Sequence, residues 1–164
     1  MNTAQEKNFS ECYEVLRDVI NIDYNLALDV FSCVKDFISE YLETEMKIDS
    51  VVKLPENANF GASVKIEGKV SFVLGVFADK NTFHEIAERY EQFPTESLDE
   101  DFDAISELLN VITGNLIVKI AERFGIEEEL EPPRYGQIEK TFDTIKIFIG
   151  SGAFYLYIGR EEIF

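Results

Sequence analysis

The stretch DAISELLNVITGN, residues 103–115, separates into two faces when it is built as a helix. One face is a broad apolar stripe, of the kind that packs on a sheet or on another helix. The opposite face carries Asp103, Glu107, Asn110 and Gly114, at spacings of four, three and four residues. The sequence therefore predicts a core helix with one polar row turned to solvent. The apolar stripe contains Leu98, Phe102, Ile105, Leu108, Leu109, Ile112, Leu116 and Ile120.

Gly114 is the unexpected member of this row, because glycine inside a helix is less favourable than alanine by about 1 kcal/mol. One explanation is clearance, since a partner's backbone or side chain can approach a helix closely at a glycine. The other is that glycine relieves crowding in a helix rich in β-branched residues. On spacing alone a functional role is the less common explanation, because a Glu-x-x-Asn pair occurs on many solvated helix faces.

Apolar periodicity and turn residues predict helices and strands on both sides of this helix. A capping box begins at Ser97 and Gly125 marks the end of the long helix. Asn25 is a candidate N-cap of an earlier helix, and a second capping box begins at Thr82. The nearly continuous apolar run over residues 70–77 predicts a central strand that is covered on both faces. The expected helices cover residues 9–20, 25–42, 82–90 and 98–124, and the six expected strands cover residues 48–54, 64–66, 70–77, 135–139, 144–149 and 153–158.

The polar row and its surroundings resemble the signature of the CheC/CheX/FliY family of bacterial chemotaxis phosphatases, and most closely its CheX branch. Asp103, Glu107 and Asn110 stand where that signature has Asp or Ser, then Glu, then Asn. Pro133 stands at the matching distance of its Pro, where it is expected to shape the chain rather than to touch a substrate. The similarity covers residues 64–158 well and residues 24–60 only loosely, and the segment before Tyr24 has no clear counterpart in the family.

The resemblance implies an α/β (α+β) architecture with the CheC-like fold. In that fold a long helix and a three-stranded antiparallel unit occur twice about a pseudo-twofold axis, and the helices pack on the sheet. A weak internal repeat agrees, because a long helix, a strand and a hairpin are predicted over residues 25–78 and again over residues 98–158. The first copy has no Glu-x-x-Asn on its helix, so one site is implied, as in CheX-type members. We expect residues 1–164 to form a single CheX-like domain, with residues 1–22 as an N-terminal helical extension.

By the same resemblance, the chain is expected to be a protein phosphatase that hydrolyses the aspartyl phosphate of a CheY-like response regulator. Asn110 would orient the attacking water, since a carboxamide donates and accepts hydrogen bonds and carries no charge. Glu107 would pair with the regulator's active-site lysine. Asp103 and Gly114 are expected to bind the partner, although a carboxylate near a helix start is also favoured by the helix dipole. No cofactor is expected in this chain, because the magnesium ion belongs to the receiver domain.

Two other classes of function stay open. A non-catalytic CheC-like module could bind a receiver domain or a flagellar switch component and use Glu107 for docking alone. Asn110 argues against this class, since a pure binder has no need of a carboxamide there. A small-molecule-binding α/β domain is the third interpretation, and no phosphate loop or cofactor motif supports it.

Charge excludes some kinds of partner. The chain carries 32 acidic and 15 basic residues, which gives a net charge of −17. A field of this sign repels phosphate backbones and anionic lipids, so neither nucleic acid nor a membrane surface is an expected partner. It favours solubility and could aid the encounter with a basic patch on a protein.

Cysteine, histidine and hydropathy patterns indicate a cytoplasmic chain without a metal site. Cys12 and Cys33 are not closely paired and are expected to be reduced and structural. His84 is the only histidine, which argues against a zinc site, and it is expected to be exposed at the start of a helix. The sequence shows no apolar signal-peptide core and no apolar run that approaches membrane-spanning length.

The aromatic strand over residues 153–158 is expected to be an unprotected edge of the sheet. CheX relatives dimerise through strand pairing, so the resemblance implies a homodimer formed at this edge. The acidic surface opposes such self-association.

Overall fold

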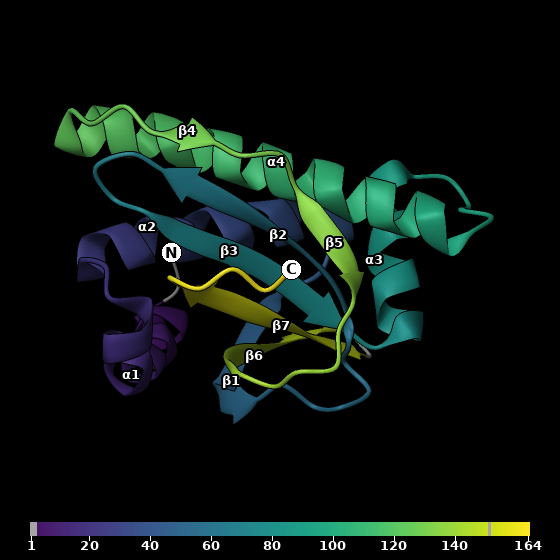
Figure 1. Ribbon diagram of the computed structural model, residues 1–164. Coiled ribbons are helices and arrows are strands. Elements are labelled where there is room, and N and C mark those ends of the chain that lie inside the picture. Colours follow the sequence, from purple (N-terminus) through teal and green to yellow (C-terminus); the bar gives the residue numbers. More distant parts are fainter. Residues whose placement is uncertain (1–2, 151) are drawn as a thin grey trace.

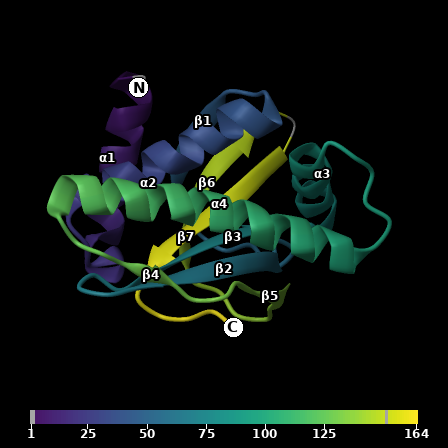
Figure 2. The same cartoon turned by 90° about the horizontal axis from the view of Figure 1, so that it is seen from above.

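In the computed structural model, the described residues, 3–150 and 152–164, form a seven-stranded antiparallel sheet with the helices on one face (Figure 1, Figure 2). Helices α2 (Tyr24–Phe37) and α4 (Leu98–Phe124) lie along this face, and α1 (Thr3–Ile20) and α3 (Lys80–Glu91) flank them. A π-helical turn, η1 (Ile38–Leu42), continues α2. The strands are β1 (Met46–Lys53), β2 (Phe60–Glu67), β3 (Phe72–Ala78), β4 (Glu129–Leu130), β5 (Arg134–Gln137), β6 (Asp143–Ile149) and β7 (Gly152–Gly159).

The strand order confirms the predicted pseudo-twofold repeat. Along the sheet the order is β1-β6-β7-β3-β2-β4, and β5 also pairs with β2. One unit is α2 with β1, β2 and β3, and the other is α4 with β5, β6 and β7. The first strand of each unit pairs with the hairpin of the other, β1 with β6 and β5 with β2. If each strand is replaced by its counterpart in the other unit, β1 by β5, β2 by β6 and β3 by β7, the order of these six strands reads the same from the opposite end of the sheet. The pair of β3 and β7 lies at the centre.

The described part of the sheet has seven strands, one more than the six predicted. The additional strand, β4, is only the pair Glu129–Leu130, which is bonded to Glu67 and Ile66 of β2. Because alternation is recognisable only over about four residues or more, a strand of this length leaves no pattern in the sequence.

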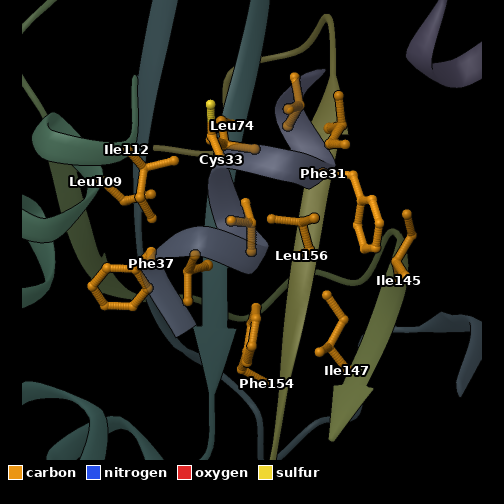
Figure 3. Packing of buried hydrophobic residues seen from close by; sticks show 14 of the residues in the cluster. Phe31, Cys33, Phe37, Leu74, Leu109, Ile112, Ile145, Ile147, Phe154 and Leu156 are labelled. Carbon is orange, nitrogen blue, oxygen red and sulfur yellow. The ribbon is translucent and has the colours of Figure 1, made fainter. Parts of the chain in front are cut away.

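The main hydrophobic core lies between the helices and the sheet, where side chains of α2, α4 and the strands pack together (Figure 3). Every residue of β3 is buried, as predicted for a central strand that is covered on both faces. Leu74 and Val76 of this strand belong to the helix-side core, whereas Val73 and Phe77 belong to a smaller cluster on the opposite face. That cluster includes Ile163, and the C-terminal segment crosses this face of the sheet in Figure 1.

The prediction that residues 153–158 form an unprotected edge is wrong. They lie in β7, which pairs with β6 on one side and with β3 on the other. Burial explains their aromatic character, because Phe154 packs in the helix-side core and Tyr157 in the opposite cluster. The composition of a strand reports how deeply it is buried, but the neighbours of a strand are set by distant parts of the chain.

Two helices begin differently from the prediction. Asp23 caps α2, and its carboxylate accepts a hydrogen bond from the Asn25 backbone N–H at 2.9 Å. Asp79 caps α3 and accepts from the Thr82 backbone N–H at 2.9 Å. In both cases the residue predicted as the cap is instead the donor, because an aspartate shortly before it satisfies the free N–H groups of the first turn.

By length and composition alone, α4 could cross a membrane, contrary to the expectation that no apolar run approaches that length. The structure packs it on α2, α3 and β2. These contacts bury the apolar face of α4, as in a core helix.

Candidate functional site

Helix α4 turns the predicted polar row to solvent. Asp103, Glu107 and Asn110 are exposed, and Gly114 is partly exposed. Of the predicted apolar stripe, every residue is buried except Leu98, which is half-buried. Both faces of the helix are thus as the sequence predicts. Glu107 and Asn110 lie on adjacent turns, where side chains three residues apart are neighbours.

The helix is held at both ends and along its buried side. The Ser97 hydroxyl accepts a hydrogen bond from the Glu100 backbone N–H at 3.2 Å. Gly125 ends the helix with φ of 64°, in the left-handed region that favours glycine. Thr113 is fully buried and donates its hydroxyl to the Leu109 carbonyl at 2.7 Å. The polar row is therefore displayed from a rigid element rather than from a loop.

Glu107 has a partner within the chain. The hydroxyl of Tyr90, near the end of α3, donates to Glu107 Oε1 at 3.1 Å. Burial raises the pKa of the Tyr90 phenol, and so do its hydrogen bond to Glu107 and the negative charge of that carboxylate. Tyr90 therefore stays a neutral donor, which holds one oxygen of Glu107 without placing a positive charge beside it.

Tyr90 belongs to a ring cluster that the sequence patterns did not predict. Its ring centroid lies 5.2 Å from that of Tyr41 in η1 and 6.1 Å from that of Phe37 at the end of α2. Tyr41 and Phe37 are stacked, with centroids 5.1 Å apart. Phe37 and Tyr41 are four residues apart, but Tyr90 follows Tyr41 by about fifty residues of chain, so no local pattern brings Tyr90 to the other two rings. The one signal of ring packing in the sequence is its content of 14 phenylalanines and 7 tyrosines.

Asn110 leaves its carboxamide unoccupied. Among the described residues, no hydrogen bond involves its side chain, and the Thr113 hydroxyl donates to its backbone carbonyl at 3.4 Å. An exposed amide of this kind can donate and accept at once toward a molecule outside the chain.

Gly114 has open space where a side chain would be. Apart from its two chain neighbours and the nearby backbone of α4, a Cβ added there would meet no heavy atom of the described residues within 4 Å. Packing within this chain therefore does not require glycine at this position, and there is no local crowding for glycine to relieve, so clearance for a partner stays the prediction.

Asp103 borders a shallow hollow of about 340 Å³ that Phe93 and Pro94 of the α3–α4 linker also line. Phe93 is 66% exposed, an unusual position for a large apolar side chain. Asp103 lies in the second turn of α4, beyond the first turn in which the helix dipole acts. The dipole therefore does not account for Asp103, and its contact with a partner stays a prediction.

His84 is held in a polar cluster, whereas the sequence predicted a free surface residue. Its Nδ1 lies 3.0 Å from Asp101 Oδ2 and its Nε2 lies 3.0 Å from Glu88 Oε1. Thr95 of the linker joins the cluster, since its hydroxyl donates to Asp101 and its backbone N–H donates to Glu88 Oε2 at 3.0 Å. The cluster ties the α3–α4 linker to both helices, and so fixes the approach to the start of α4.

The stability of the protein should fall as the pH rises from about 6 toward 8. The hydrogen bond to Asp101 raises the pKa of His84 above its ordinary value of 6.5, against the opposing effect of burial, and the charges of Asp101 and Glu88 add to the rise. A raised folded-state pKa stabilises the fold below the unfolded pKa, and this contribution is lost as pH rises through the folded pKa. Because His84 is the only histidine, NMR titration follows a single imidazole. An imidazole pKa at or below 6.5 contradicts this account. So does a His84→Gln variant whose free energy of unfolding depends on pH in the same way as that of the wild-type protein.

The described residues offer no metal centre, since none of their histidine, cysteine, aspartate and glutamate side chains form a group of three placed to hold an ion. Cys12 and Cys33 are free and buried, as expected. Burial raises the pKa of both thiols to about 11, so they are neutral at physiological pH.

The fold is similar to that of several solved structures. A CheX protein from Desulfovibrio desulfuricans has a TM-score of 0.67 and 15% identity, over 84% of this chain and 99% of that chain. A chain of the CheX-CheY-BeF3-Mg+2 complex from Borrelia burgdorferi has a TM-score of 0.66 and 16% identity, over 86% and 99%. FliY from Thermotoga maritima has a TM-score of 0.55 and 16% identity, over 83% and 86%. No curated protein sequence matches significantly.

These likenesses, together with the interlocked repeat, define a CheC-like α+β domain with one polar row on its second long helix. The family described as chemotaxis phosphatase CheX matches residues 60–141, half of the 164-residue chain, and the match contains the whole row. The chain belongs to the CheX family.

Proposed function

We propose that this protein acts in the cytoplasm and hydrolyses the aspartyl phosphate of a CheY-like receiver domain. The observation that carries the proposal is the exposure of Glu107 and Asn110 side by side on α4, within the stretch that matches the CheX family. A structural relative from Borrelia burgdorferi occurs in a complex with CheY, which supports a receiver domain as the partner.

The reaction requires positioning more than new chemistry. Water attacks the phosphorus, the bond from phosphorus to the aspartyl oxygen breaks, and its electron pair stays on the departing carboxylate as phosphate is released. An acyl phosphate is already activated, so this chain need supply no nucleophile. The unoccupied carboxamide of Asn110 is suited to hold the water in line, because it has no charge to repel the phosphoryl group.

Glu107 is assigned to docking. Its carboxylate is exposed one turn before Asn110, where it can pair with the active-site lysine of the receiver and fix the register of the two proteins. A magnesium ion held by the receiver would balance charge on the receiver's side of the interface.

Phosphate release tests the proposal. Purified receiver proteins from the same genome are phosphorylated, and the loss of phosphate is followed with and without this protein. At least one receiver should lose its phosphoryl group faster when the protein is present. If a receiver binds but loses its phosphate no faster than it does alone, the protein is a scaffold that docks receivers rather than a phosphatase.

Gly114→Ala should stabilise the protein and weaken the receiver complex at the same time. Alanine raises the free energy of unfolding by about 0.5–1 kcal/mol, since it favours the helix and meets nothing within the chain. The added methyl group would occupy the space that a close-approaching partner needs. Urea unfolding and receiver binding measure the two effects, with Val111→Ala, exposed on the same helix but off the row, as the control. Unchanged binding of Gly114→Ala would contradict a role for Gly114 in clearance for the partner.

We further expect a homodimer, although not through β7, which is central. The outer strands are β1 at one end of the sheet and β4 with β5 at the other. The β1 edge is partly closed, because the Ile48 backbone N–H donates to Gln5 Oε1 of α1 at 3.1 Å. Light scattering at high micromolar concentration should give twice the mass of one chain, and a monomer there contradicts the expectation.

A further inference from the structure

We propose that Tyr90 is a positioning residue, which holds the Glu107 carboxylate in the orientation that the receiver recognises. This inference rests on the proposed function, because it assigns a role to a neighbour of the docking residue. Tyr90 does not itself belong to the polar row of α4, since it lies near the end of α3.

The contact is specific to one oxygen of the carboxylate. Tyr90 donates to Glu107 Oε1 at 3.1 Å, while no described residue bonds Oε2. An exposed glutamate otherwise samples several rotamers, and ordering it on binding costs free energy. A donor from the same chain removes part of that cost, and leaves the second oxygen for the partner.

A tyrosine suits this task better than a basic side chain. Lysine or arginine at the same place would hold the carboxylate, but would also neutralise it and so compete with the lysine of the receiver. The phenol donates without charge, and its raised pKa keeps it protonated at physiological pH. The electrostatic attraction that Glu107 offers is therefore kept intact.

The ring of Tyr90 is itself held by the irregular end of α2. In the π-helical turn η1, Tyr41 packs against Tyr90, with their ring centroids 5.2 Å apart. The Leu42 carbonyl of the same turn accepts from Arg89 Nη1 at 2.7 Å, which ties η1 to α3 one residue before Tyr90. Single π-helical turns occur frequently at functional sites. In this protein η1 holds the ring of Tyr90 in place, and Tyr90 in turn holds the Glu107 carboxylate.

Tyr90→Phe tests the inference, because it removes the hydroxyl and keeps the ring. Tyr41→Phe is the matched control, since its hydroxyl makes no hydrogen bond to Glu107. Dephosphorylation of the receiver is measured at several receiver concentrations, and binding is measured with the beryllofluoride form. We expect Tyr90→Phe to raise KM and Kd about fivefold, the effect of losing one exposed hydrogen bond to a charged group, with kcat unchanged within about twofold. Tyr41→Phe should match the wild-type protein.

A double-mutant cycle separates positioning from a general structural effect. In a Glu107→Gln background the charge is already lost, so adding Tyr90→Phe should change KM by less than about twofold. The inference is overturned if Tyr90→Phe behaves like wild type, or if it costs the same factor in both backgrounds. A wild-type protein that neither binds nor dephosphorylates any receiver overturns the proposed function, and this inference with it.

Discussion

Asn110→Ala is expected to abolish the acceleration of receiver dephosphorylation while the two proteins still bind. Losing a group that holds the attacking water in line removes orientation that exists only in the transition state, an effect of about a hundredfold or more on rate. Binding should change little, because the carboxamide is neutral and makes no hydrogen bond within the described chain. The measurement is the rate of phosphate loss at saturating receiver, together with binding of the beryllofluoride form.

Asn110→Ala should leave the stability of the fold nearly unchanged. Asn110 is exposed, and alanine is favourable in a helix, so the free energy of unfolding should stay within about 0.5 kcal/mol of the wild-type value. A loss of rate in Asn110→Ala without a loss of stability is therefore assigned to the chemical step. Retained acceleration in a variant that binds normally removes Asn110 from the mechanism.

Glu107→Ala is expected to fail differently, by weakening the complex. Removing one member of a charge pair at an interface leaves the receiver's lysine without its partner, which costs about 2 kcal/mol, or roughly thirtyfold in Kd. The wild-type complex should weaken with added salt, and the Glu107→Ala complex should depend on salt less steeply. Titration of the beryllofluoride receiver at two ionic strengths measures both effects.

Glu122→Ala is the matched control for this prediction. Glu122 is an exposed glutamate on the same helix, beyond the polar row, so its loss changes the net charge equally without removing the docking group. Equal weakening by the two variants would mean that only the overall negative field attracts the receiver. Full affinity in Glu107→Ala would remove the docking role altogether.

Much of the fold could be predicted because its patterns are local. The apolar stripe of α4 repeats over many turns, and Ser97 and Gly125 define where the helix begins and ends. The two faces of that helix follow from the same periodicity, so the sequence alone predicts the exposure of Glu107 and Asn110. The completely buried strand β3 is likewise visible as an unbroken apolar run.

What could not be predicted depends on contacts between distant parts of the chain. The central place of β7 results from pairing with β3, a strand about eighty residues earlier, and strand composition does not record such a partner. The bond from Tyr90 to Glu107 and the cluster around His84 depend in the same way on how α3 packs against α4. A motif identifies the residues of a site more readily than the residues that support them.

The central claim is that Asn110 makes this protein a phosphatase, and the most direct test compares two asparagines on one helix. Asn115 is exposed on α4 but borders the groove toward α2, away from the polar row. The rate of phosphate loss from one phosphorylated receiver is measured with the wild-type protein, Asn110→Ala and Asn115→Ala. The wild-type protein and Asn115→Ala should accelerate the loss equally. With Asn110→Ala, the receiver should lose its phosphate at the rate that it shows alone. Equal acceleration by all three, or by none, contradicts the claim.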